Sequence, residues 1–305
     1  MTRKLVATAF GAPREVLTVI DVPRPSDGDV IVDVKAAGLN PFDVKSVKGV
    51  MGTDPARLPL TIGNEGAGVV REAAADTGFV AGDRVVVYPA SGTFAQTVAV
   101  PAGSAHRLPD GVGFDEAAGL LLAGATAFDL VETLDIGADD TVLVHGGAGA
   151  VGSIVVVLAV GRGATAIASA SPRNHDAVRA LGARPVSYGE GFLYAVREAA
   201  SSPVTAAIDT VGSDEAIDVS LALVGADRVA SIAAWGRVDD GITVLNGSSE
   251  ASKKHRRDAV EPLLAALADG RVTVEIAGTS TLDDAADAFE ALAGDHPRGK
   301  YILHP

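Results

Sequence analysis

The sequence has no cysteine among its 305 residues. This absence excludes disulfide bonds, thiolate catalysis and metal sites built from cysteine ligands. Positive charge is also scarce, since 25 lysines and arginines face 39 acidic residues and give a net charge of −14. Nucleic-acid binding depends on neutralising phosphates with basic side chains, so we expect no nucleic-acid partner.

Long apolar runs are missing as well. The first ten residues, MTRKLVATAF, lack the apolar core of a signal peptide, and every apolar stretch is interrupted by glycine or charge before it reaches the length of a membrane span. We therefore expect a cytoplasmic protein with no membrane partner.

Hydrophobic residues make up 48% of the chain and charged residues 21%, as in ordinary soluble globular proteins. The length allows two domains, and the high content of glycine, valine and alanine suits an α/β architecture. One basic run, Lys253–Arg257, lies early in an expected helix. We interpret it as a solvated helix face, because charged runs on helices usually face water.

The stretch Thr141–Gly152, TVLVHGGAGAVG, organises the chain. Its first half is a short apolar run typical of a buried parallel strand. Its second half fits G-x-G-x-x-G and leads into a helix expected over Ser153–Val160, so we predict a dinucleotide site with its phosphates at the amino end of that helix. The expected cofactor-binding residues here are Gly147, Ala148, Gly149, Ala150, Val151 and Gly152.

The next strand, Ala164–Ala170, ends in a segment that distinguishes the two nicotinamide cofactors. NAD sites usually place a carboxylate about 20 residues after the motif, but none occurs between Ala168 and Asn174. Ser171 instead resembles the N-cap of a helix that begins at Pro172, and with Arg173 and Asn174 it offers donors to a 2′-phosphate. We therefore predict NADPH. The alternative is that Ser171 only caps and Arg173 faces water.

Before the dinucleotide motif the pattern is one of short strands separated by glycine, proline and aspartate, which predicts a β-rich domain. The expected strands are Lys4–Phe10, Val16–Val22, Val30–Ala36, Gly68–Glu72, Arg84–Tyr88 and Phe94–Val100, with a short helix over Phe42–Lys48. From Asp115 to Leu134 the apolar spacing becomes helical.

Strands and helices then alternate, which predicts a doubly wound parallel sheet of two mononucleotide halves. The expected strands are Val142–His145, Thr165–Ala170, Pro185–Tyr188, Ala206–Asp209, Arg228–Ala233 and Ile242–Leu245. A long helix over Ala251–Asp269, a strand over Val272–Ile276, a helix over Leu282–Ala293 and a strand over Lys300–Leu303 follow. We expect this tail to pack on the β-rich domain, which makes that domain discontinuous.

Several motifs together resemble the medium-chain dehydrogenase/reductase superfamily and, within it, the zinc-free quinone oxidoreductases related to zeta-crystallin. They are AGLNPFD at 37–43, GNEGAG at 63–68, AGDRV at 81–85, TAF at 126–128, the GGAGAVG turn and GKYIL at 299–303. The resemblance implies a GroES-like substrate domain over residues 1–117 and 265–305 and a Rossmann domain over residues 118–264.

Zinc-dependent relatives hold their catalytic metal with Cys, His and Cys at positions that match Asn40, Asn64 and Leu122 here. None of the three can supply that ligand set, and the six histidines, at 106, 145, 175, 255, 296 and 304, form no close pair with a carboxylate. We therefore expect no metal. Without a Lewis acid, reduction of an activated acceptor such as a quinone or an α,β-unsaturated carbonyl is favoured over alcohol oxidation.

The matched positions give the catalytic candidates Asn40, Lys45 and Thr126, with Thr126 beside the nicotinamide. Lys45 stands where family members often have a tyrosine, and it is either a proton donor or a solvated lysine. Asn40 either contacts substrate or caps its own turn. Glu65 is expected to tie its loop by hydrogen bonds.

Residues at the carboxyl ends of later strands complete the coenzyme site, because ligands bind there in open α/β sheets. We expect Asp209 to fix a turn near the cofactor and Ile232 and Ala233 to lie along the ribose and nicotinamide.

The predicted function is an NADPH-dependent, zinc-independent reductase of quinones or α,β-unsaturated carbonyl compounds. Two alternatives remain: a pathway-specific enoyl or carbonyl reductase with one narrow substrate, and an NADPH-binding protein without turnover. The resemblance also implies a homodimer, with the edge strand Ile242–Leu245 as the place where two subunits pair.

Overall fold

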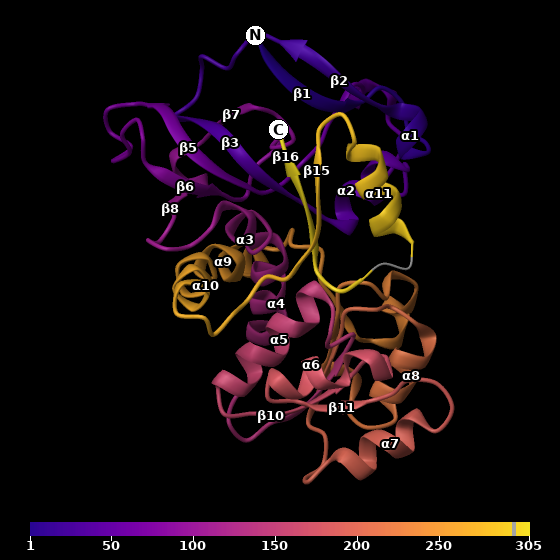
Figure 1. Ribbon diagram of the computed structural model, residues 1–305. Helices are drawn as coiled ribbons and strands as arrows, with labels where there is room; N and C mark the ends of the chain where they lie inside the picture. Colours follow the sequence, from indigo (N-terminus) through magenta and orange to yellow (C-terminus); the bar gives the residue numbers. More distant parts are fainter. Residues whose placement is uncertain (295–296) are drawn as a thin grey trace. The chain divides into compact units, whose positions relative to one another are not determined.

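The computed structural model describes residues 1–294 and 297–305. The chain forms two compact units, one of Met1–Leu122 with Leu264–Pro305 and one of Ala123–Leu263. The sequence placed these limits after residues 117 and 264. Figure 1 labels helices and strands of both units along the chain.

The first unit is β-rich and carries two sheets. Its strands are β1 (Thr2–Ala7), β2 (Leu17–Val22), β3 (Val30–Leu39), β4 (Leu60–Thr61), β5 (Gly66–Ala73), β6 (Arg84–Val87), β7 (Thr97–Val100), β8 (Ala105–Arg107), β15 (Ile276–Thr281) and β16 (Lys300–His304). The order is β2-β1-β4 in the small sheet and β15-β16-β3-β5-β6-β8 in the large one, with β7 also paired to β3. This arrangement confirms the predicted β-rich domain and agrees with the GroES-like domain that the family resemblance implies.

The long strand β3 is the centre of the large sheet, and nearly all its side chains are buried. It pairs antiparallel with β5, and Gly68 permits their close approach, because a Cβ on Gly68 would lie 2.1 Å from the Asp33 carbonyl oxygen. Four short helices accompany these sheets: α1 (Pro13–Val16), α2 (Pro41–Val47), α3 (Phe114–Ala118) and α11 (Ala285–Ala293).

The C-terminal tail completes the first unit, as expected. Strand β16 pairs antiparallel with β3, with Leu303 opposite Ala37, and the yellow tail strands accordingly lie beside β3 in Figure 1. Helix α11 packs through Phe289, whose ring meets that of Phe94 edge-on at 6.0 Å. The strand expected at Val272–Ile276 is wrong: β15 begins at Ile276, because its register is set by parallel pairing with β16.

The second unit is a doubly wound sheet of six parallel strands, which confirms the predicted Rossmann architecture. The strands are β9 (Thr141–His145), β10 (Thr165–Ser169), β11 (Arg184–Val186), β12 (Ala206–Asp209), β13 (Val229–Ser231) and β14 (Thr243–Val244). Their order is β11-β10-β9-β12-β13-β14, and every neighbouring pair is parallel. The strand order therefore reverses between β9 and β12, the place where such sheets bind nucleotides.

Helices α5 (Ala150–Gly161), α6 (His175–Ala180), α7 (Phe192–Ala199) and α8 (Asp214–Leu221) connect these strands. A buried apolar cluster that includes Leu143, Ile167 and Ile217 holds strands and helices together. Over residues 1–294 and 297–305, no helix combines the length and the apolar character that crossing a bilayer requires.

Two helices expected to be continuous are broken. The first is split into α3 and α4 (Leu121–Thr133), because α3 ends with Gly119 as its C-cap. The second is split into α9 (Glu250–Asp258) and α10 (Val260–Ala268). Pro262 explains this second break, since a proline in the first turn of a helix has no N–H with which to continue the preceding one.

Candidate functional site

The turn after β9 is built so closely that only glycine fits. Gly146 has a positive φ of 75°, and a Cβ on Gly147 would lie 2.4 Å from the Ala168 Cβ. A Cβ on Gly152 would lie 2.2 Å from the Gly146 carbonyl oxygen. The sequence therefore identified the glycine-rich turn correctly, but the left-handed residue is Gly146, which stands one position before the motif.

The amino end of α5 faces solvent at the carboxyl edge of the sheet. The helix begins at Ala150, earlier than the expected Ser153, with Gly149 as its N-cap, and both residues are exposed. Within the described part of the chain no side chain caps this end. The backbone N–H groups of Ala150, Val151 and Gly152 belong to the first turn of the helix, where an α-helix provides no carbonyl partners, and such groups can donate to an anion. Ala148, in the turn before them, is 8% exposed.

The end of β10 gathers the residues predicted to distinguish the cofactors. Ser171 is the N-cap of a single 3₁₀ turn, Pro172–Asn174, rather than of the expected α-helix. Its Oγ accepts a hydrogen bond of 3.2 Å from the Asn174 side chain, and Arg173 is exposed beside them. Three polar side chains are thus presented together where β10 ends.

Tyr188, which the sequence reasoning did not single out, lies near the same edge. The Ala170 N–H donates to the Val186 carbonyl at 3.0 Å, so the end of β11 runs alongside the end of β10. Tyr188 follows two residues later with 59% of its surface exposed. The signal that identifies it is an exposed aromatic residue immediately after a strand.

Asp209 fixes the turn after β12, as expected. Its fully buried carboxylate accepts hydrogen bonds of 3.0 Å from the N–H groups of Val211 and Gly212, and one of 2.6 Å from the Ser231 hydroxyl. Ser231 Oγ also accepts from the Ala233 N–H at 3.0 Å. Asp209 therefore holds the ends of β12 and β13 in register.

The segment after β13 lies at this carboxyl edge. The Ile232 N–H donates to the Asp209 carbonyl at 3.2 Å, and Ile232 and Ala233 are both partly exposed. The sequence placed these two residues along the ribose and nicotinamide. The structure brings them beside the turn that Asp209 fixes.

His145 is the last residue of β9 and directly precedes the glycine turn. The ring is 1% exposed, lies edge-on to Phe192 and is 2.9 Å from the Ser220 hydroxyl. Burial lowers the pKa of His145 to about 4, against a smaller opposing effect of Asp209. The imidazole is therefore neutral at physiological pH and serves as a packed polar element of the strand.

Thr126 lies on α4, 7% exposed, and its hydroxyl oxygen accepts a hydrogen bond of 3.1 Å from Arg256 Nη1. Arg256 belongs to the basic run that was expected to face water. That expectation holds for Lys253, Lys254 and Arg257, which are exposed, but it is wrong for His255 and Arg256. Those two side chains turn inward because the buried carboxylate of Asp129 attracts both of them.

In the first unit, Asn40 follows β3 and is 2% exposed. Its Nδ2 donates to the Gly38 carbonyl at 3.1 Å and to Glu65 Oε1 at 2.9 Å, while its Oδ1 accepts from Lys300 at 2.5 Å. Glu65 is fully buried, and its other oxygen accepts from the Leu122 N–H at 2.8 Å. The Asn40 amide is therefore occupied by the protein, and Glu65 ties its loop by hydrogen bonds as expected.

Asp43 forms a second buried junction next to Asn40. One carboxylate oxygen accepts from the Asn40 N–H at 2.9 Å, and the other accepts from the Asn64 side chain at 2.7 Å and the Gly63 N–H at 3.2 Å. Burial raises the pKa of Asp43 to about 7, despite these hydrogen bonds and the nearby Lys300. Lys45, by contrast, is exposed on α2.

Metal-binding side chains do not gather in the described part of either unit. Across residues 1–294 and 297–305, no three His, Asp or Glu side chains lie close enough to hold an ion. The positions matched to zinc ligands are occupied by Asn40, which is saturated, Asn64, which is bonded to Asp43, and the backbone of Leu122. His296 lies outside the described residues. The expected absence of a metal remains a prediction.

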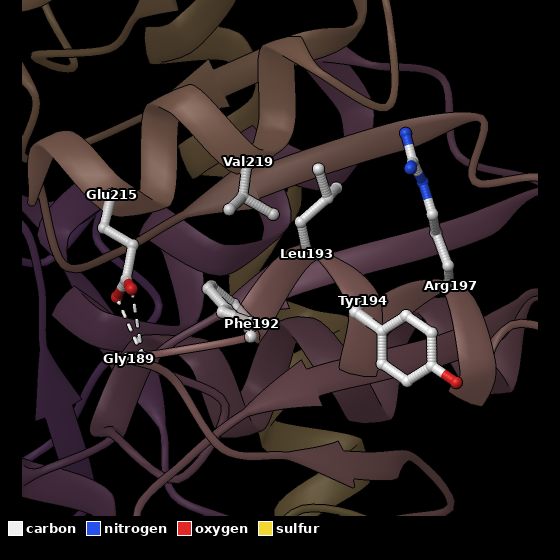
Figure 2. Close-up of a pocket in the computed structure, with 8 residues that line it drawn as sticks. Gly189, Phe192, Leu193, Tyr194, Arg197, Glu215 and Val219 are labelled. Atoms are coloured by element: carbon white, nitrogen blue, oxygen red, sulfur yellow. Dashed lines mark hydrogen bonds between the residues drawn. The ribbon is translucent and has the colours of Figure 1, made fainter.

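A surface hollow of about 400 Å³ lies between the start of α7 and α8, apart from all the residues predicted from the sequence. Figure 2 shows Glu215 reaching the Gly189 backbone, whose N–H it binds at 3.0 and 3.2 Å, while Leu193 and Val219 line the wall. Tyr194 and Arg197 also line the hollow. The hollow is an open groove between two helices.

Comparison with known families supports both units. The pattern of the alcohol dehydrogenase GroES-like domain matches residues 26–110, and that of the zinc-binding dehydrogenase family matches residues 181–303. Among curated proteins, the quinone oxidoreductase of Salmonella typhimurium is 29% identical over 333 aligned positions that cover both chains completely. The human synaptic vesicle membrane protein VAT-1 homolog is 32% identical over 70% of this chain.

The chain spans 56% of the length of that human protein and 43% of a mouse VAT-1 homolog-like protein. Among solved structures, mycobacterial Rv1454c in complex with NADPH aligns with a TM-score of 0.86, and the quinone oxidoreductase of Pseudomonas syringae aligns with a TM-score of 0.85. Each is 28% identical, and each alignment covers both chains completely.

Proposed function

Since the chain belongs to the quinone oxidoreductase family of the medium-chain dehydrogenase/reductase superfamily, we propose that it is an NADPH-dependent reductase of quinones or α,β-unsaturated carbonyl compounds. The observation that carries this proposal is the glycine turn at the amino end of α5. It lies at the carboxyl edge of the sheet, next to the point where the strand order reverses between β9 and β12.

The coenzyme lies across this edge in the proposed complex. The exposed amino end of α5 receives the pyrophosphate, because its first-turn N–H groups and the helix dipole favour an anion. Gly147 and Gly149 let the backbone approach the phosphates. The mononucleotide half formed by β9, β10 and β11 takes the adenosine, and the half formed by β12, β13 and β14 takes the nicotinamide.

The preference for NADPH rests on the end of β10. Ser171, Arg173 and Asn174 present a hydroxyl, a guanidinium and an amide, and the segment 168–174 contains no carboxylate that would repel a phosphate. A guanidinium binds phosphate in two-pronged geometry, and the charge-assisted bonds are among the strongest available. The exposed Tyr188 follows the end of β11, the strand that pairs with β10.

The nicotinamide half is bounded by Ile232, Ala233 and Thr126 in this proposal. NADPH, when bound there, supplies the hydride for the electron-poor carbon of the acceptor. The protein has to orient the acceptor and stabilise the negative charge that develops on its carbonyl oxygen, and hydrogen-bond donors do this effectively in a site from which water is excluded.

Lys45 is the proposed proton donor or oxyanion contact, because it is the charged side chain exposed on α2 next to the Asn40–Asp43 junction. For Asn40, the saturated amide favours a supporting role: it holds the loop that presents Asn64. The side chains at Asn40, Asn64 and Leu122 suit a reaction without zinc, since amides and an aliphatic chain are poor zinc ligands.

We assign coenzyme binding to the unit Ala123–Leu263 and substrate binding to the β-rich unit. A homodimer through the sheet edge at β14 is part of the proposal, because β14 pairs with β13 alone within its sheet and so leaves one edge open. Sedimentation of the purified protein tests this association.

The test of function is oxidation of NADPH and NADH by the purified, chelator-treated protein with a panel of quinones and enones. We expect turnover that prefers NADPH and survives chelation. Turnover with only one shaped enoyl or carbonyl acceptor would indicate the narrow-substrate reductase instead. Tight NADPH binding without turnover of any acceptor would indicate a binding protein, and a lack of NADPH binding would contradict the proposal.

A further inference from the structure

We propose that Arg256 is a positioning residue. It fixes the Thr126 hydroxyl and the segment Asn246–Ser249 relative to one another at the nicotinamide end of the coenzyme site. This inference rests on the proposed function, since it concerns the same site. It assigns a role to a basic residue that the sequence pattern placed on a solvated face.

Arg256 binds α4 at two points. Its Nε donates to Asp129 Oδ2 at 3.2 Å, and its Nη1 donates to Thr126 Oγ1 at 3.1 Å. Thr126 and Asp129 are three residues apart on α4 and therefore share one helix face. Only 20% of the Arg256 side chain is exposed, so the guanidinium is held between helices rather than extended into water.

Asp129 is the anchor of this arrangement. It is fully buried and accepts hydrogen bonds from the Ser252 hydroxyl and from His255 Nδ1 as well as from Arg256. Because Ser252 and His255 already bind the carboxylate, Arg256 is not its sole partner. The second hydrogen bond of Arg256 goes to a different residue, Thr126, and couples it to the same guanidinium.

Arg256 also meets the backbone of the segment that follows β14. A Cβ on Gly247 would lie 2.9 Å from Arg256 Nε and 3.0 Å from its Cζ, and Gly247 has a positive φ of 77°. Hydrogen bonds fix the segment around Gly247. The Ser248 N–H donates to Asn246 Oδ1, and Ser249 caps α9. The guanidinium thus lies close to the backbone of this turn.

This turn lies at the nicotinamide end of the sheet. The Leu245 N–H donates to the Ser231 carbonyl at 2.8 Å, so Asn246 leaves the carboxyl edge directly beside the end of β13. Ser231 in turn binds Asp209 and the Ala233 N–H. Arg256 therefore links the second mononucleotide half to Thr126 through contacts that lie within one unit.

Replacement of Arg256 by lysine distinguishes the effect of its positive charge from the effect of its two-point hydrogen bonding. Lysine keeps the cation for Asp129 but lacks the planar fork, so it cannot bond Asp129 and Thr126 at once. We would compare Arg256→Lys with Lys254→Ala, which removes an exposed ion pair to Asp258 from the same helix. The readouts are unfolding temperature, binding of 2′,5′-ADP, emission of the NADPH nicotinamide in the binary complex, and kcat with a quinone acceptor.

For Arg256→Lys we expect unchanged 2′,5′-ADP binding, altered nicotinamide emission and a kcat lowered about 10- to 100-fold, as for a misplaced reactant. Lys254→Ala should match the unsubstituted protein in all four. Arg256→Lys with unchanged kcat and emission overturns the inference. So does an equal loss of 2′,5′-ADP and NADPH binding with a lower unfolding temperature, because that marks a purely structural role.

If Arg256→Lys does not fold, Thr126→Val tests the other end of the same bond and should give the same pattern. If both fold, the double variant should lose no more kcat than the more impaired single variant, because the two changes break one link. Additive losses would overturn the inference. A failure of the unsubstituted protein to bind NADPH removes the proposed function, and this inference with it, and is recognised before any variant is made.

Discussion

The Lys300 ammonium donates a hydrogen bond of 2.5 Å to Asn40 Oδ1, across 260 residues of sequence. Lys300 begins the last strand, and Asn40 directly follows the long strand β3, so the bond fastens the C-terminal tail to the centre of the β-rich sheet. The same ammonium lies 3.1 Å from the fully buried Glu65. The cation that neutralises Glu65 therefore comes from the tail.

Replacement of Lys300 by methionine should destabilise the protein strongly. The variant leaves the Glu65 carboxylate buried without its cation, a change that typically costs about 3–5 kcal/mol in the free energy of unfolding. Chemical denaturation measures it. Lys35→Met removes an exposed lysine from β3 and is the matched control. A loss for Lys300→Met no larger than that of the control would contradict the assignment.

Gly152→Ala should damage the coenzyme site. The new Cβ would lie 2.2 Å from the Gly146 carbonyl oxygen, so the glycine turn has to move, and overpacking of this kind costs about 1–3 kcal/mol. We expect NADPH affinity, measured by fluorescence titration, to fall by at least about tenfold, since the phosphate-binding N–H groups move with the turn. Gly161→Ala in the same helix is the control, because, apart from its chain neighbours and the backbone of its own helix, no atom lies within 4 Å of its Cβ position.

His145 should make stability depend on acidity. Burial lowers its pKa in the folded protein to about 4, while the unfolded chain has the ordinary value near 6.5. As pH falls below 6.5, the histidine binds a proton in the unfolded state but not in the folded state. The contribution of His145 to the free energy of unfolding is therefore fully present above pH 6.5 and is lost progressively down to pH 4. The contribution changes by at most about 1.4 kcal/mol per pH unit.

The measurement is the free energy of unfolding from pH 7 to pH 4.5 for the protein and for His145→Gln. Asp43, whose pKa is raised to about 7, acts in the opposite direction over this range and is common to both proteins, so the difference between them isolates the histidine. We expect that difference to shrink toward acid. A constant difference, or an imidazole that titrates near 6.5 by NMR, would show that His145 is not desolvated.

Arg173→Ala should weaken NADPH much more than NADH. Only NADPH carries the 2′-phosphate that the guanidinium is proposed to bind, and loss of such a charge-assisted contact costs about 1.5–3 kcal/mol, or roughly 10- to 150-fold in affinity. Arg179→Ala, which removes an exposed arginine paired with Asp176 on α6, is the control. Equal effects on the two cofactors would remove Arg173 from the phosphate site.

Local sequence patterns were sufficient to predict those helices and strands whose formation depends mainly on their own residues. The apolar run before GGAGAVG predicts β9, and alternation of strands and helices predicts the parallel sheet, because burial on both faces and right-handed crossovers leave few other arrangements. Breaks within helices were missed. Gly119 and Pro262 were visible in the sequence, but the apolar spacing continued past them and outweighed the two signals.

Partners of buried polar groups were beyond the reach of pattern reasoning. Lys253–Arg257 has the composition of a solvated face, yet Asp129, more than 120 residues earlier, draws His255 and Arg256 inward. The sequence left Asn40 either as a substrate contact or as a cap of its own turn, and only the fold shows that its amide binds Gly38, Glu65 and Lys300.

The sequence by itself determined the family, the two architectures and the position of the glycine turn, because each depends on residues that are near one another in the chain. Tertiary structure alone decided which charges are buried, which amide is saturated, and which histidine stays neutral. Those properties arise where segments distant in sequence exclude water from a polar group, and there the dielectric environment, rather than the residue type, sets its chemistry.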